Sequence, residues 1–211
     1  MTDCAHAIGA SYYGKKVGAI EDIAAFSFYP SKNLGCIGEA GGIATNDENL
    51  ADLCRKFRDH GSTKKFVHTH IGLNARMDGI NAAILSVKLK YLDDWNNDRI
   101  RIAGIYNSRL SDLKIDTPVV EKNLSHVFHI YQIQIMNRDY ILSKMQEKGI
   151  GGNIHYPVPL HLHEGFSFLK NKKGDFPVAE KLADNTLSLP CYPYMKDQQA
   201  EYVCKVLKSI M

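Results

Sequence analysis

The chain has 211 residues, of which 45% are hydrophobic and 23% are charged, and its formal net charge at pH 7 is +3. These proportions are those of a soluble globular protein that is long enough to bury a core. The small net charge argues against nucleic acid or an acidic membrane surface as a partner, and no apolar run is long enough to span a bilayer.

The first 45 residues contain turn and strand signals. Residues 14–18 predict a hairpin-like turn, and residues 23–29 and 41–45 predict two short strands. Between these strands the aromatic run ends at Pro30, and Lys32 stands in a loop of small and polar residues. Such a loop presents an amine at the rim of a sheet, although a plain surface lysine explains this stretch equally well.

Helices are predicted in the middle of the chain. Asp47 is the expected N-cap of a helix that ends near Arg58, whereas residues 59–77 are expected to be irregular. Asp78 can cap a long helix with a broad apolar surface, which indicates burial against more than one neighbour. That surface comprises Ile80, Ile84, Leu85, Val87, Leu89, Tyr91 and Leu92. Residues 93–98 are the predicted domain boundary, although a bent helix could continue through them.

The remainder predicts a compact α+β unit. Residues 129–136 alternate apolar and polar side chains, as a half-buried strand does. Helices are predicted over 138–148 and 176–187, with Pro177 in the first turn of the second. The last helix has a predicted core-facing stripe of Tyr202, Val203, Val206, Leu207 and Ile210.

The cysteines and histidines allow other chemistries. Two His-x-His pairs raise the hypothesis of a metal-dependent hydrolase: His68 with His70, and His161 with His163, next to Glu164. No HExxH motif or cysteine pair accompanies them, so we expect no metal. Cys36 could be a nucleophile, but it has no matched base and is expected to be a buried thiol. The odd, scattered set of five cysteines and the absence of a signal peptide predict a cytoplasmic protein.

Several short segments share their order and spacing with one known family. In chain order they are residues 3–10, 26–33, 41–47, 60–61, 72–77, 82–83 with Leu89, 149–150, 155–157 and 187–190. Together they resemble the DegT/DnrJ/EryC1/StrS sugar-nucleotide aminotransferases, which are pyridoxal-phosphate enzymes of fold type I. Members are longer at the N-terminus, so this chain is expected to be a C-terminal portion that lacks the first part of the large domain.

The resemblance implies a fold class and a domain division. The expected fold is α/β, with the C-terminal part of a fold-type-I large domain followed by a small α+β domain. The large-domain part is expected over residues 1–95, with the cofactor lysine and the long interface helix, and the small domain over residues 96–211.

The resemblance makes Lys32 the residue that forms a Schiff base with pyridoxal 5′-phosphate. Its freed amine would then move a proton between the α-carbon of an amino donor and C4′ of the cofactor. A lysine of ordinary pKa, near ~10.4, is protonated at neutral pH, so its surroundings or the Schiff base must deprotonate it. Relatives with histidine at this position carry out dehydration, so Lys32 favours transamination.

Four further residues match cofactor contacts of the family. Asp3 matches the carboxylate that pairs with the pyridine nitrogen, and His6 stands where relatives have Gln or His near the phenolic oxygen. Ser27 matches a hydroxyl donor to the phosphate. Asn74 matches a residue that reaches the phosphate in the neighbouring subunit, which implies a homodimer with shared active sites. Three of these residues also have a plain structural explanation: a polar residue in a frayed terminus for Asp3, a core histidine for His6 and a strand serine for Ser27.

Three residues match the substrate side of the site. Arg76 either stabilises its loop or contacts substrate. His155 and Tyr156 match the segment at the substrate mouth, although a tight turn fixed by Pro157 and Pro159 explains them equally well.

The implied reaction transfers an amino group, with glutamate as the expected donor, to a 3- or 4-keto-deoxy sugar nucleotide in surface-glycan or amino-sugar biosynthesis. The alternative is a truncated, non-catalytic family fragment that keeps the dimerisation surface but cannot bind the cofactor fully.

Overall fold

The computed structural model describes all 211 residues, and the chain divides into two compact units. The first unit comprises residues 1–97 and 120–129, and the second comprises residues 98–119 and 130–211. The units differ from the expected domains, 1–95 and 96–211, mainly in the place of residues 120–129; the domain division itself stays a prediction. No helix combines the length and the apolar character needed to cross a membrane.

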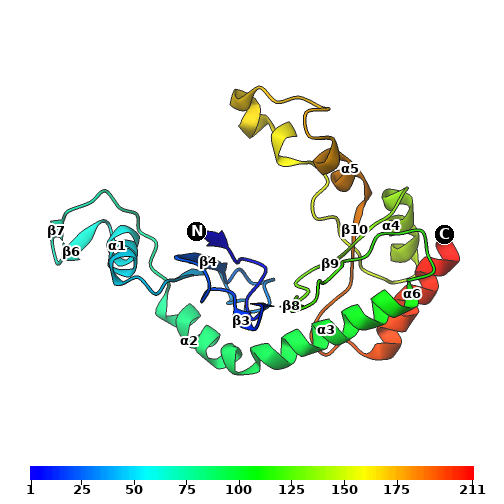
Figure 1. The fold of residues 1–211 in the computed structure, drawn as a ribbon, viewed down its shortest axis with the longest axis horizontal. Helices are drawn as coiled ribbons and strands as arrows, with labels where there is room; N and C mark the ends of the chain where they lie inside the picture. Colours follow the sequence, from blue (N-terminus) through cyan, green and yellow to red (C-terminus); the bar gives the residue numbers. More distant parts are fainter. The chain divides into compact units, whose positions relative to one another are not determined.

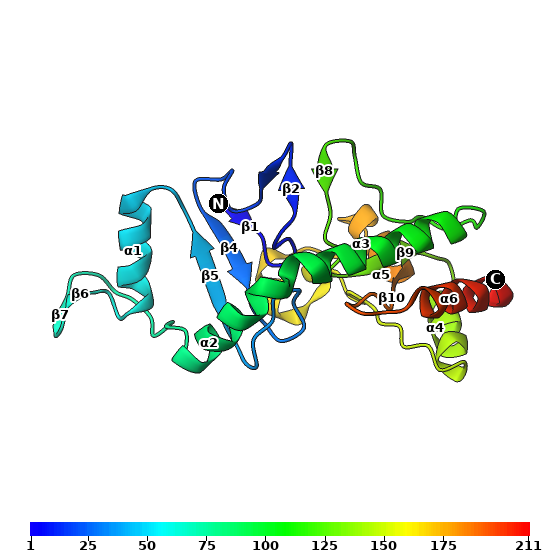
Figure 2. The ribbon, with the colours of Figure 1, turned by 90° about the horizontal axis from the view of Figure 1, so that it is seen from below.

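A three-stranded sheet carries the candidate lysine loop of the first unit (Figures 1 and 2). β1 (Thr2–Asp3) pairs in parallel with β4 (Ala24–Ser27), and β4 pairs antiparallel with β5 (Gly41–Ala44). The strands predicted over 23–29 and 41–45 are confirmed. β1 was not expected, because two residues are too short a run to show a hydrophobic period.

A second small sheet joins distant parts of the chain. β2 (Ser11–Tyr12) and β3 (Lys15–Lys16) form the predicted hairpin, and β8 (Leu124–Ser125) pairs with β2. The Ser125 side chain accepts a hydrogen bond from the Ser11 backbone at 2.7 Å, across a separation of 114 residues. Residues 120–129 therefore complete the first unit.

Helix α1 (Glu48–Arg58) begins as predicted, with the Asp47 carboxylate accepting hydrogen bonds from two backbone amides of the first turn. The expectation of an irregular stretch over 59–77 is wrong for its first half. β6 (Ser62–Lys64) and β7 (Val67–His68) form a hairpin there. All of these strand residues except Ser62 are exposed, so no apolar alternation marks the hairpin in the sequence.

The long helix is bent, as the sequence allows. α2 (Gly79–Lys88), the 3₁₀ turn η1 (Leu89–Tyr91) and α3 (Leu92–Arg109) follow one another without a loop. Asp78 occupies the N-cap position, but its side chain makes no capping hydrogen bond. The apolar surface is only partly buried: Leu85 and Leu92 pack with Leu34 and Cys36, whereas Ile80, Val87, Leu89 and Tyr91 are exposed.

The second unit is built on a two-stranded antiparallel sheet with helices. β9 (Tyr131–Gln134) pairs with β10 (Thr186–Leu189), and the helices are α4 (Arg138–Glu147), α5 (Pro177–Asn185) and α6 (Asp197–Ile210). The predicted strand and helices are confirmed, whereas β10 was not expected as a strand.

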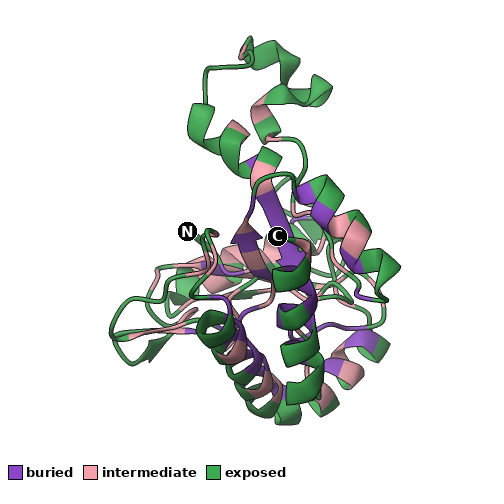
Figure 3. Cartoon of the chain, turned by 90° about the vertical axis from the view of Figure 1, so that its right-hand side faces the viewer, coloured by how far each residue is buried: buried purple, intermediate pink, exposed green.

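The core of the second unit contains Tyr131, Ile133, Leu187 and Leu207, all fully buried. Tyr202 does not belong to the buried stripe of α6, because it is 46% exposed and its hydroxyl reaches the Lys148 carbonyl. The segment with the 3₁₀ turns η2 (Leu160–Leu162) and η3 (Glu164–Leu169), yellow in Figure 1, is almost entirely exposed in Figure 3.

Candidate active site

Lys32 lies in a tight turn directly after β4. Its backbone amide donates to the Tyr29 carbonyl at 2.9 Å. A Cβ atom on Gly35 would lie 2.3 Å from the Pro30 carbonyl oxygen, so only glycine permits this close return of the chain. The Lys88 ammonium, from α2, donates to the Gly35 carbonyl. The backbone of the loop that carries Lys32 therefore has a defined shape.

The structure brings Asp3 and Lys32 together. Because β1 lies parallel to β4, Asp3 aligns with Ala25, the second residue of the strand that leads into the lysine turn. Burial lowers the pKa of the Lys32 amine, whereas the nearby Asp3 carboxylate raises it, and burial prevails. A half-buried amine with a lowered pKa beside a carboxylate has the properties of a lysine that acts as a base or nucleophile.

Ser27 is the last residue of β4 and is half-buried. Its hydroxyl oxygen accepts a hydrogen bond from the Tyr29 backbone amide at 3.3 Å, so it faces the turn that carries Lys32. A hydroxyl can accept one bond while donating its own hydrogen to an anion. This position agrees with a donor to a phosphate bound at the lysine loop.

Asn33, directly after the candidate lysine, is the centre of a buried polar network that the sequence did not reveal. Its side-chain amide donates to Asn96 Oδ1 at 2.7 Å and to the Val127 carbonyl at 3.1 Å. Its Oδ1 lies 3.1 Å from His129 Nδ1, and the His129 ring packs against His6 with 4.4 Å between ring centroids. The one available signal was an asparagine next to the lysine, because the partners lie 63 to 96 residues away.

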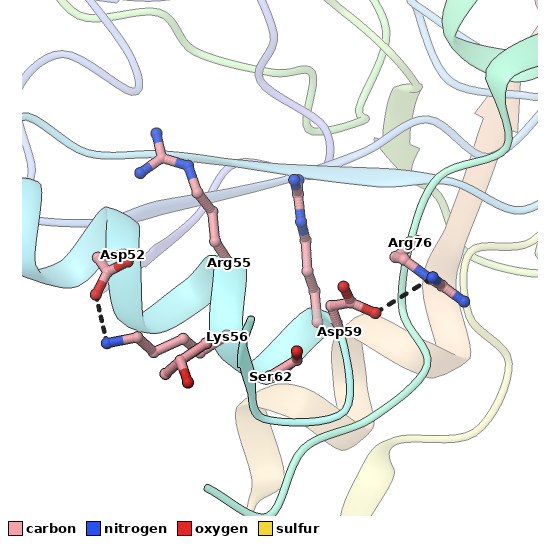
Figure 4. A pocket seen from close by; sticks show the side chains of 8 residues that line it. Asp52, Arg55, Lys56, Asp59, Ser62 and Arg76 are labelled. Atoms are coloured by element: carbon pink, nitrogen blue, oxygen red, sulfur yellow. Dashed lines mark ion pairs between the residues drawn. The ribbon is translucent and has the colours of Figure 1, made fainter. Parts of the chain in front are cut away.

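Asn74 and Arg76 form a separate group with Asp59, the residue that follows α1; Figure 4 shows Arg76 and Asp59. Arg76 Nε donates to Asn74 Oδ1 at 3.3 Å, and an Arg76 NH group lies 3.2 Å from Asp59 Oδ1. Asp59 and Asn74 also pair through their backbones. These contacts are compatible with the stabilisation of its loop, one of the two expected roles for Arg76, and leave the contact with substrate untested.

A small cavity of about 280 Å³ adjoins this group and is lined mainly by charged side chains of α1 and the residues after it. Lys56 pairs with Asp52 at 2.5 Å and Arg76 with Asp59, as the dashed lines in Figure 4 show. Four of the charges therefore neutralise each other within the cavity wall.

His155 and Tyr156 lie in the second unit, on the wall of a mostly apolar cavity of about 1010 Å³. His155 Nδ1 is 2.8 Å from Ser188 Oγ on β10, and its carbonyl accepts a hydrogen bond from Gln132 on β9. The Tyr156 side chain is 65% exposed. The sheet thus fixes His155, while Tyr156 presents its ring at the surface.

The other histidines and Cys36 have local partners. His68 bonds to the His60 carbonyl and His70 to Thr69, whereas His161 contacts Glu180 at 2.9 Å and His163 contacts the Val158 carbonyl. No three His, Cys, Asp or Glu side chains come together as a metal site would require. Cys36 is buried, and its thiol donates to the Phe28 and Gly38 carbonyls.

The chain is similar in sequence to proteins of one known family. The family model described as "DegT/DnrJ/EryC1/StrS aminotransferase family" matches residues 1–208. A pleiotropic regulatory protein of Geobacillus stearothermophilus is 45% identical over 96% of this chain and 55% of its own length. A dTDP-3-amino-3,4,6-trideoxy-alpha-D-glucose transaminase of Streptomyces venezuelae is 40% identical over 99% of this chain and 55% of its own length.

The fold also matches a solved structure. S. venezuelae DesV in complex with a ketimine intermediate superposes with a TM-score of 0.94 and 39% identity, over 98% of this chain and 56% of DesV. The chain thus spans little more than half the length of the relatives that it matches.

Proposed function

Because the chain belongs to the DegT/DnrJ/EryC1/StrS aminotransferase family, we propose that it carries the lysine side of a pyridoxal-phosphate-dependent sugar-nucleotide aminotransferase site. The observation that carries the proposal is the Lys32 amine, which is half-buried, has a lowered pKa and lies near the Asp3 carboxylate. A lowered pKa increases the share of neutral amine, which is the form that acts as a nucleophile or base.

The residues around Lys32 fit the cofactor. Lys32 would bond to it covalently, Asp3 would hold a proton at its ring nitrogen, and Ser27 would donate a hydrogen bond to its phosphate. His6 would lie near its phenolic oxygen, and Asn74 would reach the phosphate of a second subunit. When bound, pyridoxal phosphate supplies an electron sink for the electrons released when a carbon next to nitrogen loses a proton.

Lys32 would then serve as the proton carrier. Its Nζ takes a proton from the carbon of the amino donor and returns one to complete the transfer. The lowered pKa increases the fraction of neutral amine, which is the form that can accept this proton. The tight turn at Gly35 gives the backbone that carries Lys32 a defined shape, which favours proton transfer between fixed positions.

The substrate class is proposed from the relatives. The S. venezuelae transaminase is named for a dTDP-linked amino sugar, and a relative in Acidithiobacillus ferrooxidans for a UDP-linked one. We propose a 3- or 4-keto-deoxy sugar nucleotide as acceptor and glutamate as donor, in surface-glycan or amino-sugar biosynthesis. His155, Tyr156 and Arg76 are the proposed substrate contacts, and the five free thiols support a cytoplasmic location.

A homodimer with shared sites is also proposed. The turn of the β6–β7 hairpin, the residues after the hairpin and one side of α2 expose large apolar side chains, among them Phe66 (85%), Ile71 (98%) and Ile80 (71%). Contiguous exposed apolar side chains mark surfaces that associate. Asn74 lies between Ile71 and Ile80 in the sequence, which supports its proposed reach to a second subunit.

The second candidate is a truncated, non-catalytic family fragment. The chain spans 55 to 57% of the length of two relatives, so residues of the remaining part of those relatives are not compared with it. Such a chain would keep the association surface without holding the cofactor firmly.

The experiment adds pyridoxal phosphate to the purified chain, reduces the mixture with borohydride and maps the labelled peptide. The proposal expects an absorbance band of bound cofactor and a single label on Lys32, lost in Lys32→Ala and kept in Lys90→Ala, an exposed control. No label, or a label that Lys32→Ala retains, would favour the non-catalytic fragment.

A further inference from the structure

The two amides of the buried network have only one arrangement that satisfies every partner. Asn96 Nδ2 donates to the Ile8 carbonyl at 3.1 Å, so Asn96 presents Oδ1 to Asn33. Asn33 Nδ2 donates to that oxygen and to the Val127 carbonyl, so Asn33 presents Oδ1 to His129. A carbonyl oxygen accepts but cannot donate.

The tautomer of His129 follows from this arrangement. Since Asn33 Oδ1 is an acceptor, His129 Nδ1 must carry a hydrogen and donate it across their 3.1 Å separation. The nearby His126 has the opposite requirement. Its Nδ1 accepts a hydrogen bond from the Phe128 backbone amide at 3.0 Å, so its neutral ring carries the hydrogen on Nε2. Burial lowers the pKa of His126, which favours that neutral ring.

The held His129 ring in turn supports His6. The ring centroids lie 4.4 Å apart with the planes tilted by 60°, a contact typical of packed aromatic rings. His129 is half-buried, whereas His6 is exposed. The His129 ring can therefore act as one wall against which the exposed His6 ring packs.

We propose that His129 is a positioning residue: Asn33 fixes its Nδ1–H form, and its ring sets the orientation of His6 beside the Lys32 loop. The network thus connects the residue after the candidate lysine to helix α3, to residues 127–129 and to His6. The assignment of the His129 tautomer depends only on the hydrogen-bond network. The role of His129 in cofactor binding rests also on the proposed function.

The first test needs no cofactor. Nitrogen-15 NMR of the histidine rings of the full chain, at a pH where they are neutral, identifies which ring nitrogen carries hydrogen. We expect Nδ1–H for His129 and Nε2–H for His126, so that two histidines three residues apart give opposite patterns. Nε2–H for His129 would overturn the inference, whether or not the chain binds pyridoxal phosphate.

The second test measures coupling to His6 by the dissociation constant of pyridoxal phosphate. His129→Phe keeps a ring but loses the Nδ1 donor, and we expect weaker binding by about tenfold, as for the loss of a supporting hydrogen bond. Because His129 acts through His6, His6→Ala combined with His129→Phe should bind no more weakly than His6→Ala alone.

His126→Ala is the control, and its effect on the dissociation constant of pyridoxal phosphate should add to that of His6→Ala. Additive effects of His129→Phe and His6→Ala would overturn the positioning role. If no variant and no wild-type chain binds the cofactor, the proposed function fails, and the NMR result still decides the arrangement of the network.

Discussion

At the scale of single residues, two opposing effects set the chemistry of Lys32. Burial removes water from the ammonium and lowers its pKa, while the Asp3 carboxylate favours the charged form and raises it. Burial is the larger effect, so the pKa of the Lys32 amine depends mainly on how far the amine is buried. The carboxylate limits the shift rather than producing it.

This balance predicts the effect of removing the Asp3 charge. Asp3→Asn should move the titration midpoint of the Lys32 amine to still lower pH, because the only group that raises its pKa is lost. The measurement is the pH dependence of Lys32 labelling by an amine-reactive reagent, read from its peptide by mass spectrometry. Asp93→Asn, an exposed charge on α3, should leave the midpoint unchanged. A midpoint that rises in Asp3→Asn would contradict the assigned balance.

The predictability of the site also differs residue by residue. Lys32, Asp3 and Ser27 stand in short motifs, and the structure places all three around one turn. Asn33 and His129 were not predicted as site residues, because their contact depends on a chain path that joins residues 96 positions apart. No local pattern in a single sequence encodes such a pairing.

At the scale of elements, local signals explain what was predicted well. Asp47 caps α1 through two short-range hydrogen bonds that involve only the next three residues, so the start of the helix was predictable. The β6–β7 hairpin was not, since it is stabilised by contacts that composition does not reveal. Gly61, for example, has φ +71° and approaches His70 so closely that a Cβ atom would lie 1.7 Å from its carbonyl oxygen.

The cap gives a prediction for the stability of α1. Asp47→Ala should lower the free energy of unfolding by about 1 kcal/mol, because two backbone amides of the first turn lose their acceptor. Urea denaturation of the whole chain, followed by circular dichroism, measures this change. Asp47→Asn keeps a capping oxygen and should cost much less. Equal losses in both variants would show that the charge, rather than the hydrogen bonds, stabilises the helix.

At the scale of the whole molecule, cofactor binding distinguishes the two candidate functions better than the exposed apolar side chains do. Both candidates include the proposed association surface, which comprises Phe66, Ile71 and the exposed side of α2. This surface is the molecular feature through which a second copy would meet Asn74.

The association surface predicts a difference between two equally exposed residues. Phe66→Ser should raise the dissociation constant of the homodimer by about tenfold, as expected for the loss of one interface aromatic side chain. Sedimentation velocity over a range of concentrations measures it. Val119→Ser is the matched control, because Val119 is 87% exposed and Phe66 85%, and it lies in the second unit. If the two substitutions changed the dissociation constant equally, Phe66 would not belong to the interface.

Every strand is only two to four residues long, so periodicity alone gives little information about the strands. The overall fold was predictable mainly because the motifs occur in a fixed order. Periodicity identified the helices and β9, whose alternation is confirmed by the buried Tyr131 and Ile133. It could not assign residues 120–129 to the first unit, because β8 is two residues long and pairs with a partner more than a hundred residues earlier.

The return of residues 120–129 to the first unit has a consequence for how the protein is made. During synthesis the lysine turn emerges before its partners, because Asn33 cannot contact the Val127 carbonyl until 94 more residues have been added. Closing loops of this length is slow compared with forming helices, so the nascent turn stays unfinished while α1, α2 and α3 can already form. Ribosome-bound chains stalled before residue 120 would therefore leave this turn open to chaperones and proteases.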